Sequence, residues 1–166
     1  MKKIILCLLT LSITFMLTGC FEKKVPDHWY DATIDYYREG FKTGWKNEKP
    51  DLYILDELKE KDKKFGYLLR DLDGDGAPEV LIGIIDDSNE TKFTDVIIWH
   101  KDFGAHRSLN TGDGYYIYLC DDNVLRMDSW YGSETNISYM IYNSENNSFL
   151  NVDGGSKPQK VELTEF

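Results

Sequence analysis

The stretch FGYLLRDLDGDGAPEVLIGII, residues 65–85, contains two hydrophobic runs separated by a segment that carries four acidic side chains. Each run is short and rich in aliphatic and aromatic residues, and the intervening Asp, Gly and Pro residues favour a turn over a helix. The stretch therefore predicts two strands joined by an acidic loop, residues 71–79. Because consecutive strands with short connections are usually antiparallel neighbours, we expect these two strands to pair.

The same alternation of short apolar runs and polar turns continues to the C-terminus, whereas the residues before it have helical spacing. A first helix is expected after Asp27, a residue type that caps helices, and Gly44 or Asn47 can end it. A second helix is expected after Pro50. Their apolar positions are Tyr30, Ile34, Tyr37 and Phe41 in the first segment and Leu52, Leu55 and Leu58 in the second. We therefore predict an α+β fold in which an N-terminal helical pair packs on an antiparallel β-meander of about six to eight strands.

The first twenty residues, MKKIILCLLTLSITFMLTGC, have the organisation of a signal peptide. Lys2 and Lys3 supply a positive start, and the apolar run after them is shorter than the roughly 20 residues of a membrane-spanning helix. The run ends in LTGC, residues 17–20, which resembles the bacterial lipobox. This resemblance implies removal of residues 1–19 and attachment of a diacylglycerol to Cys20. We therefore expect a lipid-anchored protein on the extracytoplasmic face of a cell membrane, with residues 20–26 as a tether.

The remaining chain, residues 27–166, is long enough for a single domain with a hydrophobic core. Hydrophobic residues make up 42% of the sequence and aromatic residues 14%, which is too apolar for a disordered chain. The formal charge is −10 and becomes two units more negative when Lys2 and Lys3 are removed. Because nucleic acids require a basic face, this acidic balance argues against a nucleic-acid partner.

Within the acidic loop, Asp71, Asp73 and Asp75 occupy alternate positions and a glycine follows them. Calcium loops begin in this way, with hard carboxylate oxygens at positions 1, 3 and 5 and a glycine where the backbone turns sharply. Position 7 is Ala77, which would offer its backbone carbonyl, and position 9 is Glu79. We therefore predict that these five residues bind a structural Ca²⁺ ion.

The loop differs from an EF-hand, because position 12 is Ile82 instead of a bidentate glutamate. It resembles the shorter D-x-D-x-D-G-x-x-(D/E) loop of FG-GAP and VCBS-type repeats, in which the ninth residue closes the site and the chain enters a strand. Residues 65–85 are also similar to a stretch found in small lipoproteins and secreted proteins of Gram-positive bacteria. Both resemblances imply an extracytoplasmic module without naming an activity, and a single loop does not support the propeller that FG-GAP arrays form. The alternative is a metal-free turn, in which the aspartates accept hydrogen bonds from nearby backbone N–H groups.

Other residue types give weaker indications of a site. Cys120 stands alone in an alternating strand, so we expect a small buried hydrophobe and no disulfide framework. The pairs at 86–87 and 121–122 are aspartates that follow strands and are expected in solvated turns. The three histidines lack zinc-ligand spacing, and these are His28, His100 and His106. The tryptophans are expected mainly in the core, with a sugar- or peptide-stacking face as the alternative, and these are Trp29, Trp45, Trp99 and Trp130.

The sequence contains no G-x-S-x-G, P-loop or HExxH signature. The leading hypothesis is a lipid-anchored binding or interaction module with an unknown envelope or extracellular ligand. One alternative is a cell-envelope hydrolase that uses carboxylates near the acidic loop, and another is an inhibitor or stress lipoprotein acting on a protein partner. A concave pocket that gathers two carboxylates beside an aromatic wall would favour the hydrolase, whereas a flat sheet face with exposed Trp and Tyr would favour binding.

Overall fold

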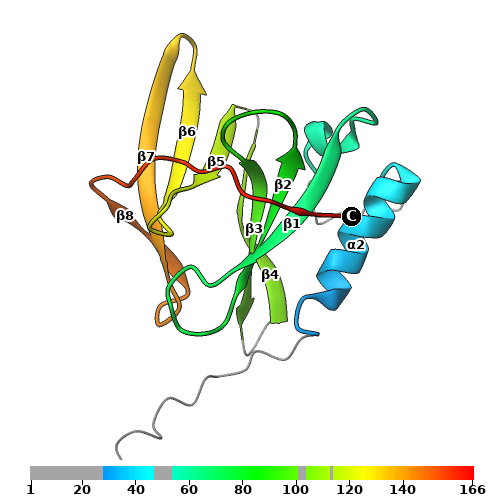
Figure 1. The fold of residues 1–166 in the computed structure, drawn as a ribbon, viewed down its shortest axis with the longest axis horizontal. Coiled ribbons are helices and arrows are strands. Elements are labelled where there is room, and N and C mark those ends of the chain that lie inside the picture. The colour runs from blue at the N-terminus through cyan, green and yellow to red at the C-terminus, as the bar shows by residue number, and fades with distance from the viewer. Residues whose placement is uncertain (1–27, 47–53, 101–103, 113) are drawn as a thin grey trace, which may run out of the picture.

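The computed structural model describes residues 28–46, 54–100, 104–112 and 114–166 (Figure 1). They form one α-helix, α2 (Asp31–Thr43), one 3₁₀ helix, η1 (Asp56–Lys59), and one sheet of nine strands. The strands are β1 (Lys64–Arg70), β2 (Glu79–Ile85), β3 (Lys92–His100), β4 (Gly104–Asn110), β5 (Tyr115–Leu119), β6 (Leu125–Tyr131), β7 (Glu134–Asn143), β8 (Ser148–Val152) and β9 (Thr164–Glu165). No helix in this part of the chain is long and apolar enough to cross a membrane. The expected signal peptide, Cys20 and the tether lie outside the described residues.

The predicted antiparallel sheet is confirmed, with nine strands in place of about six to eight. It departs from a meander twice, since β5 pairs with β3 and β9 returns to pair with β1. Its order is β8-β7-β6-β5-β3-β2-β1-β9, and β4 also pairs with β3. β3 holds two partners on one edge, since residues 92–93 pair with β5 and residues 95–100 pair with β4. The sequence did not predict β4 as a strand, because GAHRSLN has no run of β-branched or aromatic residues and is only half-buried.

Only one of the two expected helices is an α-helix. α2 begins after Tyr30 and ends at Gly44, whose φ of 65° is a left-handed conformation that glycine adopts readily. In the described part of the second segment, from residue 54 on, the helical structure is the four-residue η1, and the charged residues after it supply no further apolar face to stabilise a helix. Leu55 and Leu58 are nevertheless buried as the apolar spacing predicted. Residues 27 and 47–53 lie outside the described residues.

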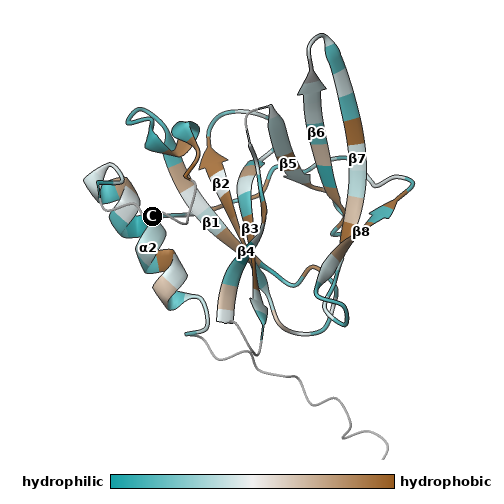
Figure 2. Ribbon diagram, turned by 180° about the vertical axis from the view of Figure 1, so that it is seen from behind, coloured by the Kyte–Doolittle hydropathy of each residue, from teal (hydrophilic) through white to brown (hydrophobic). Residues whose placement is uncertain are grey.

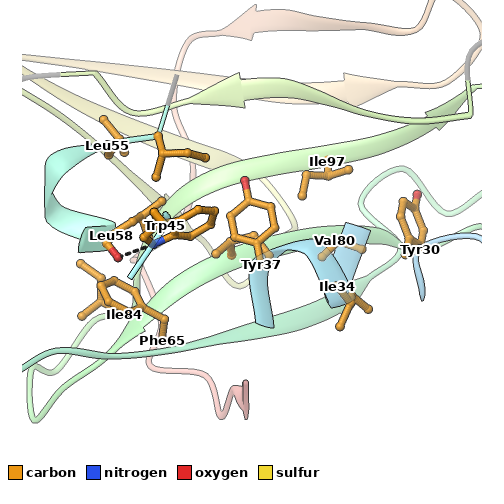
Figure 3. Packing of buried hydrophobic residues seen from close by; sticks show 12 residues of the cluster. Tyr30, Ile34, Tyr37, Trp45, Leu55, Leu58, Phe65, Val80, Ile84 and Ile97 are labelled. Atoms are coloured by element: carbon orange, nitrogen blue, oxygen red, sulfur yellow. Dashed lines mark hydrogen bonds between the residues drawn. The ribbon is translucent and has the colours of Figure 1, made fainter. Parts of the chain in front are cut away.

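One hydrophobic core lies between α2 and strands β1 to β3 (Figure 3). The helix contributes Ile34 and Tyr37 to this core, and Tyr30 joins them from the position just before the helix. Trp45, which follows the helix, is 5% exposed, and its Nε1 donates to the backbone carbonyl of Leu58 at 2.9 Å. The expectation that the tryptophans lie in the core is therefore confirmed for Trp45. Because alternate residues of a strand point to opposite faces, the other half of each strand faces a second core.

The second core lies on the opposite face of the sheet and is covered by the C-terminal segment. β2 is buried almost throughout and appears as a hydrophobic ribbon in the middle of the sheet (Figure 2). The C-terminal segment crosses the sheet from β8 toward β1 (Figure 1), and its Val161 and Leu163 pack against this core. A Cβ at Gly83 would lie 3.0 Å from Leu163 Cδ1 and 2.9 Å from the Lys92 carbonyl. Glycine at this position thus allows the segment to approach the sheet.

Candidate metal site and adjoining pocket

The acidic loop lies between β1 and β2 and contacts two turns that are distant in the sequence. The side-chain amide of Asn123, in the β5–β6 turn, donates to the Asp71 carbonyl at 3.0 Å. The backbone N–H of Ser144, in the β7–β8 turn, donates to Asp73 Oδ2 at 2.8 Å. These partners are 52 and 71 residues away along the chain. The loop therefore ties together the turns at one end of the curved sheet.

Inside the loop, the aspartates accept hydrogen bonds from the backbone that surrounds them. Asp71 accepts the N–H groups of Gly74 and Gly76 at 2.7 and 2.9 Å. Asp75 Oδ1 accepts the N–H of Ala77 at 2.7 Å. The two glycines have φ values of 79° and 87°, a conformation that strongly favours glycine. These contacts are those expected of a metal-free turn, and they also hold the carboxylates in a defined arrangement.

The carboxylates of Asp71, Asp73 and Asp75 converge. One oxygen from each lies within 4.8 Å of the others, so the group could hold a metal ion. Among the described residues, no other group of three His, Cys, Asp or Glu side chains converges in this way, and Glu79 does not belong to the group. Exposed acidic groups are common without a metal, so the identity of the ion and the roles of Ala77 and Glu79 stay predictions.

Glu79 lies at the base of the loop and is only 3% exposed. Its Oε2 accepts the backbone N–H of Leu72 at 2.8 Å. Burial raises the pKa of Glu79 to about 8 against the opposing effect of this hydrogen bond, and the negative charges of the three loop aspartates raise it further. Among the described residues, no ion pair includes Glu79. A divalent cation in the loop would therefore offset the repulsion between Glu79 and the three aspartates, which no described cationic side chain offsets.

A pocket of about 320 Å³ lies beside the acidic loop and shares Asp75, Ala77 and Glu79 with it. Its wall is aromatic, and the four rings are those of Trp29, Tyr30, Trp99 and Tyr142. The two indole rings are stacked, with 3.9 Å between centroids and 15° between planes. The rings come from the start of the helical segment, the end of β3 and the end of β7. Sequence reasoning missed this pocket because no local pattern connects these positions.

The two phenol hydroxyls of the pocket wall are engaged by the protein. Tyr142 Oη donates to Asn147 Oδ1 at 3.0 Å. Tyr30 hydrogen-bonds the backbone of Trp99, which joins the start of α2 to the end of β3. Burial raises the pKa of Tyr142 to about 12, and the charge of Glu79 adds to this effect. The wall is therefore held in place before any ligand arrives.

The remaining sequence-predicted residues lie apart from the loop's carboxylate group. Cys120 is buried as expected, and burial raises the pKa of its thiol to about 11, the opposite of what a nucleophilic thiol needs. The aspartates at 86–87 and 121–122 lie in the predicted turns. His28 is exposed, and the rings of His100 and His106 are 6.5 Å apart. Trp130 is 39% exposed on β6 and contradicts the expectation of a core position.

Comparisons of the chain with protein-family models, with curated proteins and with solved structures find no match in any of the three. The resemblance to FG-GAP loops therefore rests on the motif alone. The features that bear on function are the geometry of the loop and of its pocket.

Proposed function

We propose that this protein is a lipid-anchored, extracytoplasmic binding module whose acidic loop binds a structural Ca²⁺ ion. The observation that carries the proposal is the convergence of Asp71, Asp73 and Asp75 within 4.8 Å directly beside a preformed pocket. Hard carboxylate oxygens in this number and spacing suit Ca²⁺. The ion would neutralise the loop and stabilise the side of the pocket to which Asp75 and Ala77 belong.

The anchor is supported by the sequence alone. A positive start, an apolar run and LTGC occur in the order of a lipoprotein signal peptide. Replacing Cys20 with Ser leaves the apolar run intact but removes the thiol that would accept the lipid. The mature variant should then lose detergent-phase partitioning, which wild type retains. Equal partitioning of the two proteins after correct signal removal would refute the anchor and leave the calcium proposal untouched.

The calcium site is tested by thermal melts in EDTA and in millimolar CaCl₂. Without a glutamate at position 12, we expect a Kd on the order of 10⁻⁴ to 10⁻³ M. At about tenfold above Kd, linkage adds roughly 1.4 kcal/mol, which corresponds to a rise in Tm of roughly 3–6 °C. Mg²⁺ should give a smaller rise, because it requires tighter octahedral geometry.

The variant for this test is Asp73→Ala, which should fold and lose the calcium-induced rise in Tm. Asp73 also accepts a hydrogen bond from Ser144, so the Tm in EDTA can change as well, and the measured quantity is the difference between the two buffers. Asp87→Ala is the matched control, since Asp87 is an exposed aspartate of another turn. Identical melts of wild type in the two buffers would leave the metal-free turn as the correct interpretation.

A carboxylate-using hydrolase is the second candidate, because the pocket gathers Asp75, Glu79 and Glu145 beside an aromatic wall. This is the arrangement that favoured a hydrolase in the sequence analysis. We prefer binding because Asp75 Oδ1 and Glu79 Oε2 already accept backbone hydrogen bonds of the loop. Turnover of nitrophenyl glycosides or esters by wild type, lost in Glu79→Gln, would instead support the hydrolase.

A further inference from the structure

The pocket beside the acidic loop has a marked imbalance of charge. Three of its lining residues carry carboxylates, and these are Asp75, Glu79 and Glu145. Among the described residues that line it, none is Lys or Arg, and His100 is the one side chain that can carry a positive charge. Glu79 retains its proton at neutral pH without calcium, because burial raises its pKa to about 8. The negative charge of the pocket then comes from Asp75 and Glu145. An anionic ligand would meet repulsion there, whereas a cation would be attracted.

The aromatic wall favours the same class of ligand. The faces of indole and phenol rings carry a negative quadrupole potential that attracts cations, and alkylated ammonium groups gain apolar contact in addition. The hydroxyl of Tyr142 already donates to Asn147, and that of Tyr30 is bonded to the Trp99 backbone. Tyr142 therefore offers a ligand mainly its ring surface.

From this combination, we infer that the pocket binds an organic cation, with an ammonium group held among the aromatic rings and near the carboxylates. A volume of about 320 Å³ is at the lower end of small-molecule pockets and suits a compact headgroup. The inference rests on the proposed binding function and names its ligand class. Ca²⁺ in the loop would offset the charge of Asp75, so the inference is made for the calcium-free protein, in which the aromatic wall and Glu145 lie outside the predicted metal ligands.

The test compares choline with 3,3-dimethyl-1-butanol, in which a neutral carbon replaces the quaternary nitrogen. Saturation-transfer NMR observes the methyl resonance of either probe, and titrations in EDTA keep the calcium loop out of the measurement. Choline should bind about tenfold more tightly than the neutral isostere, because shape and apolar surface are matched and only the charge differs. Binding should weaken as salt is added.

Two variants locate the site. Trp99→Phe should weaken choline binding several-fold, because phenylalanine is a poorer cation–π partner than tryptophan. Glu145→Gln should weaken it by about twofold to fivefold, since Glu145 is exposed to solvent. The matched controls are Trp130→Phe on β6 and Glu134→Gln at the start of β7, which change an exposed tryptophan and an exposed glutamate that do not line the pocket and should bind as wild type does.

Equal binding of choline and its neutral isostere, or binding of glucose in place of choline, would overturn the inference. So would undetectable choline binding, or binding that Trp99→Phe leaves unchanged while the variant retains the wild-type melt. None of these outcomes alters the calcium melt or the Cys20→Ser partitioning. Failure of the ligand class is therefore distinguishable from failure of the anchored calcium module.

Discussion

Asp95 and Glu79 are both buried carboxylates on neighbouring strands, but only Asp95 has a cationic partner among the described residues. Asp95 is fully buried, and Arg107 Nη1 lies 3.2 Å from its Oδ1. Thr94 and Tyr37 also hydrogen-bond its side chain. Burial raises the pKa of Asp95, and Arg107 opposes that rise. Glu79 receives one backbone hydrogen bond, and three further carboxylates raise its pKa.

Asp95 is neutralised by a side chain of the protein itself, whereas Glu79 is suited to a cation that comes from outside. Arg70 is paired with Glu79 in the register of β1 and β2, yet its Nε donates to Asn123 at 2.8 Å. A buried carboxylate without a cation is destabilising when ionised, so it either keeps its proton or acquires a counter-ion. Asp95 is stabilised by the fold itself. The acidic loop gains its full stability with a proton or a cation.

The largest expected effect comes from removing the partner of Asp95. Arg107→Met keeps the length of the side chain but leaves Asp95 buried without its counter-charge, and this should cost about 3–5 kcal/mol at neutral pH. Urea unfolding of the variant against wild type measures the loss. The double variant Asp95→Asn, Arg107→Met should be clearly more stable than Arg107→Met alone, because no buried charge then lacks a partner. A single variant within about 1 kcal/mol of wild type would contradict this account.

Glu79 should make the stability depend on pH in the absence of calcium. Its folded pKa is raised from 4.5 to about 8, so the folded state retains a proton that the unfolded chain releases. The associated stability is present in full below pH 4.5 and is lost as the pH rises toward 8. Between about pH 5.5 and 8, wild type in EDTA should lose on the order of 2–3 kcal/mol relative to Glu79→Gln.

Urea unfolding at three pH values in that window checks this prediction, with Glu134→Gln as an exposed glutamate control that should keep the wild-type slope. Saturating Ca²⁺ should reduce the slope, because the ion favours the ionised loop. Parallel pH profiles for wild type and Glu79→Gln in EDTA would show that Glu79 ionises at its ordinary pKa despite its burial.

The strands were predictable because their information is local. Alternating apolar residues and Asp-Gly turns identified β1 to β3 and β5 to β8, and the acidic loop lies where its sequence indicated. β4 was not predicted, since its side chains are half-buried and its pairing depends on β3. Within the described residues, the second expected helix is the short 3₁₀ helix η1. Its leucines are buried as expected, but burial of Leu55 and Leu58 requires only one turn, η1.

The site was predictable only in its contiguous part. Three aspartates at alternate positions converge because the loop between them is short and turns at Gly74 and Gly76. The aromatic wall brings together residues 29, 99 and 142, and their meeting depends on how the sheet curves and where α2 begins. The partner of Asp95 was equally invisible, since Arg107 reaches it from a strand that the pattern did not reveal.

The smallest expected effect concerns a carboxylate that water already solvates. Asp86 lies in the turn after β2, and the side chains of Asp86 and Lys160 are 38% and 43% exposed at a separation of 3.7 Å. Burial alone would raise the pKa of Asp86, but hydrogen bonds from Ser88 and the charge of Lys160 lower it.

Because water screens this pair, Lys160→Met should change the free energy of unfolding by no more than about 0.5 kcal/mol. Lys160 also donates a hydrogen bond to the Asp86 carbonyl at 2.6 Å. Because the variant loses this bond, any change in stability should be a loss. The measurement is urea unfolding at low and high salt beside Arg107→Met. If Lys160→Met loses nearly as much stability as Arg107→Met, an exposed ion pair contributes as much as a buried one in this fold. Burial of Glu79 would then be no reason to expect a cation beside it.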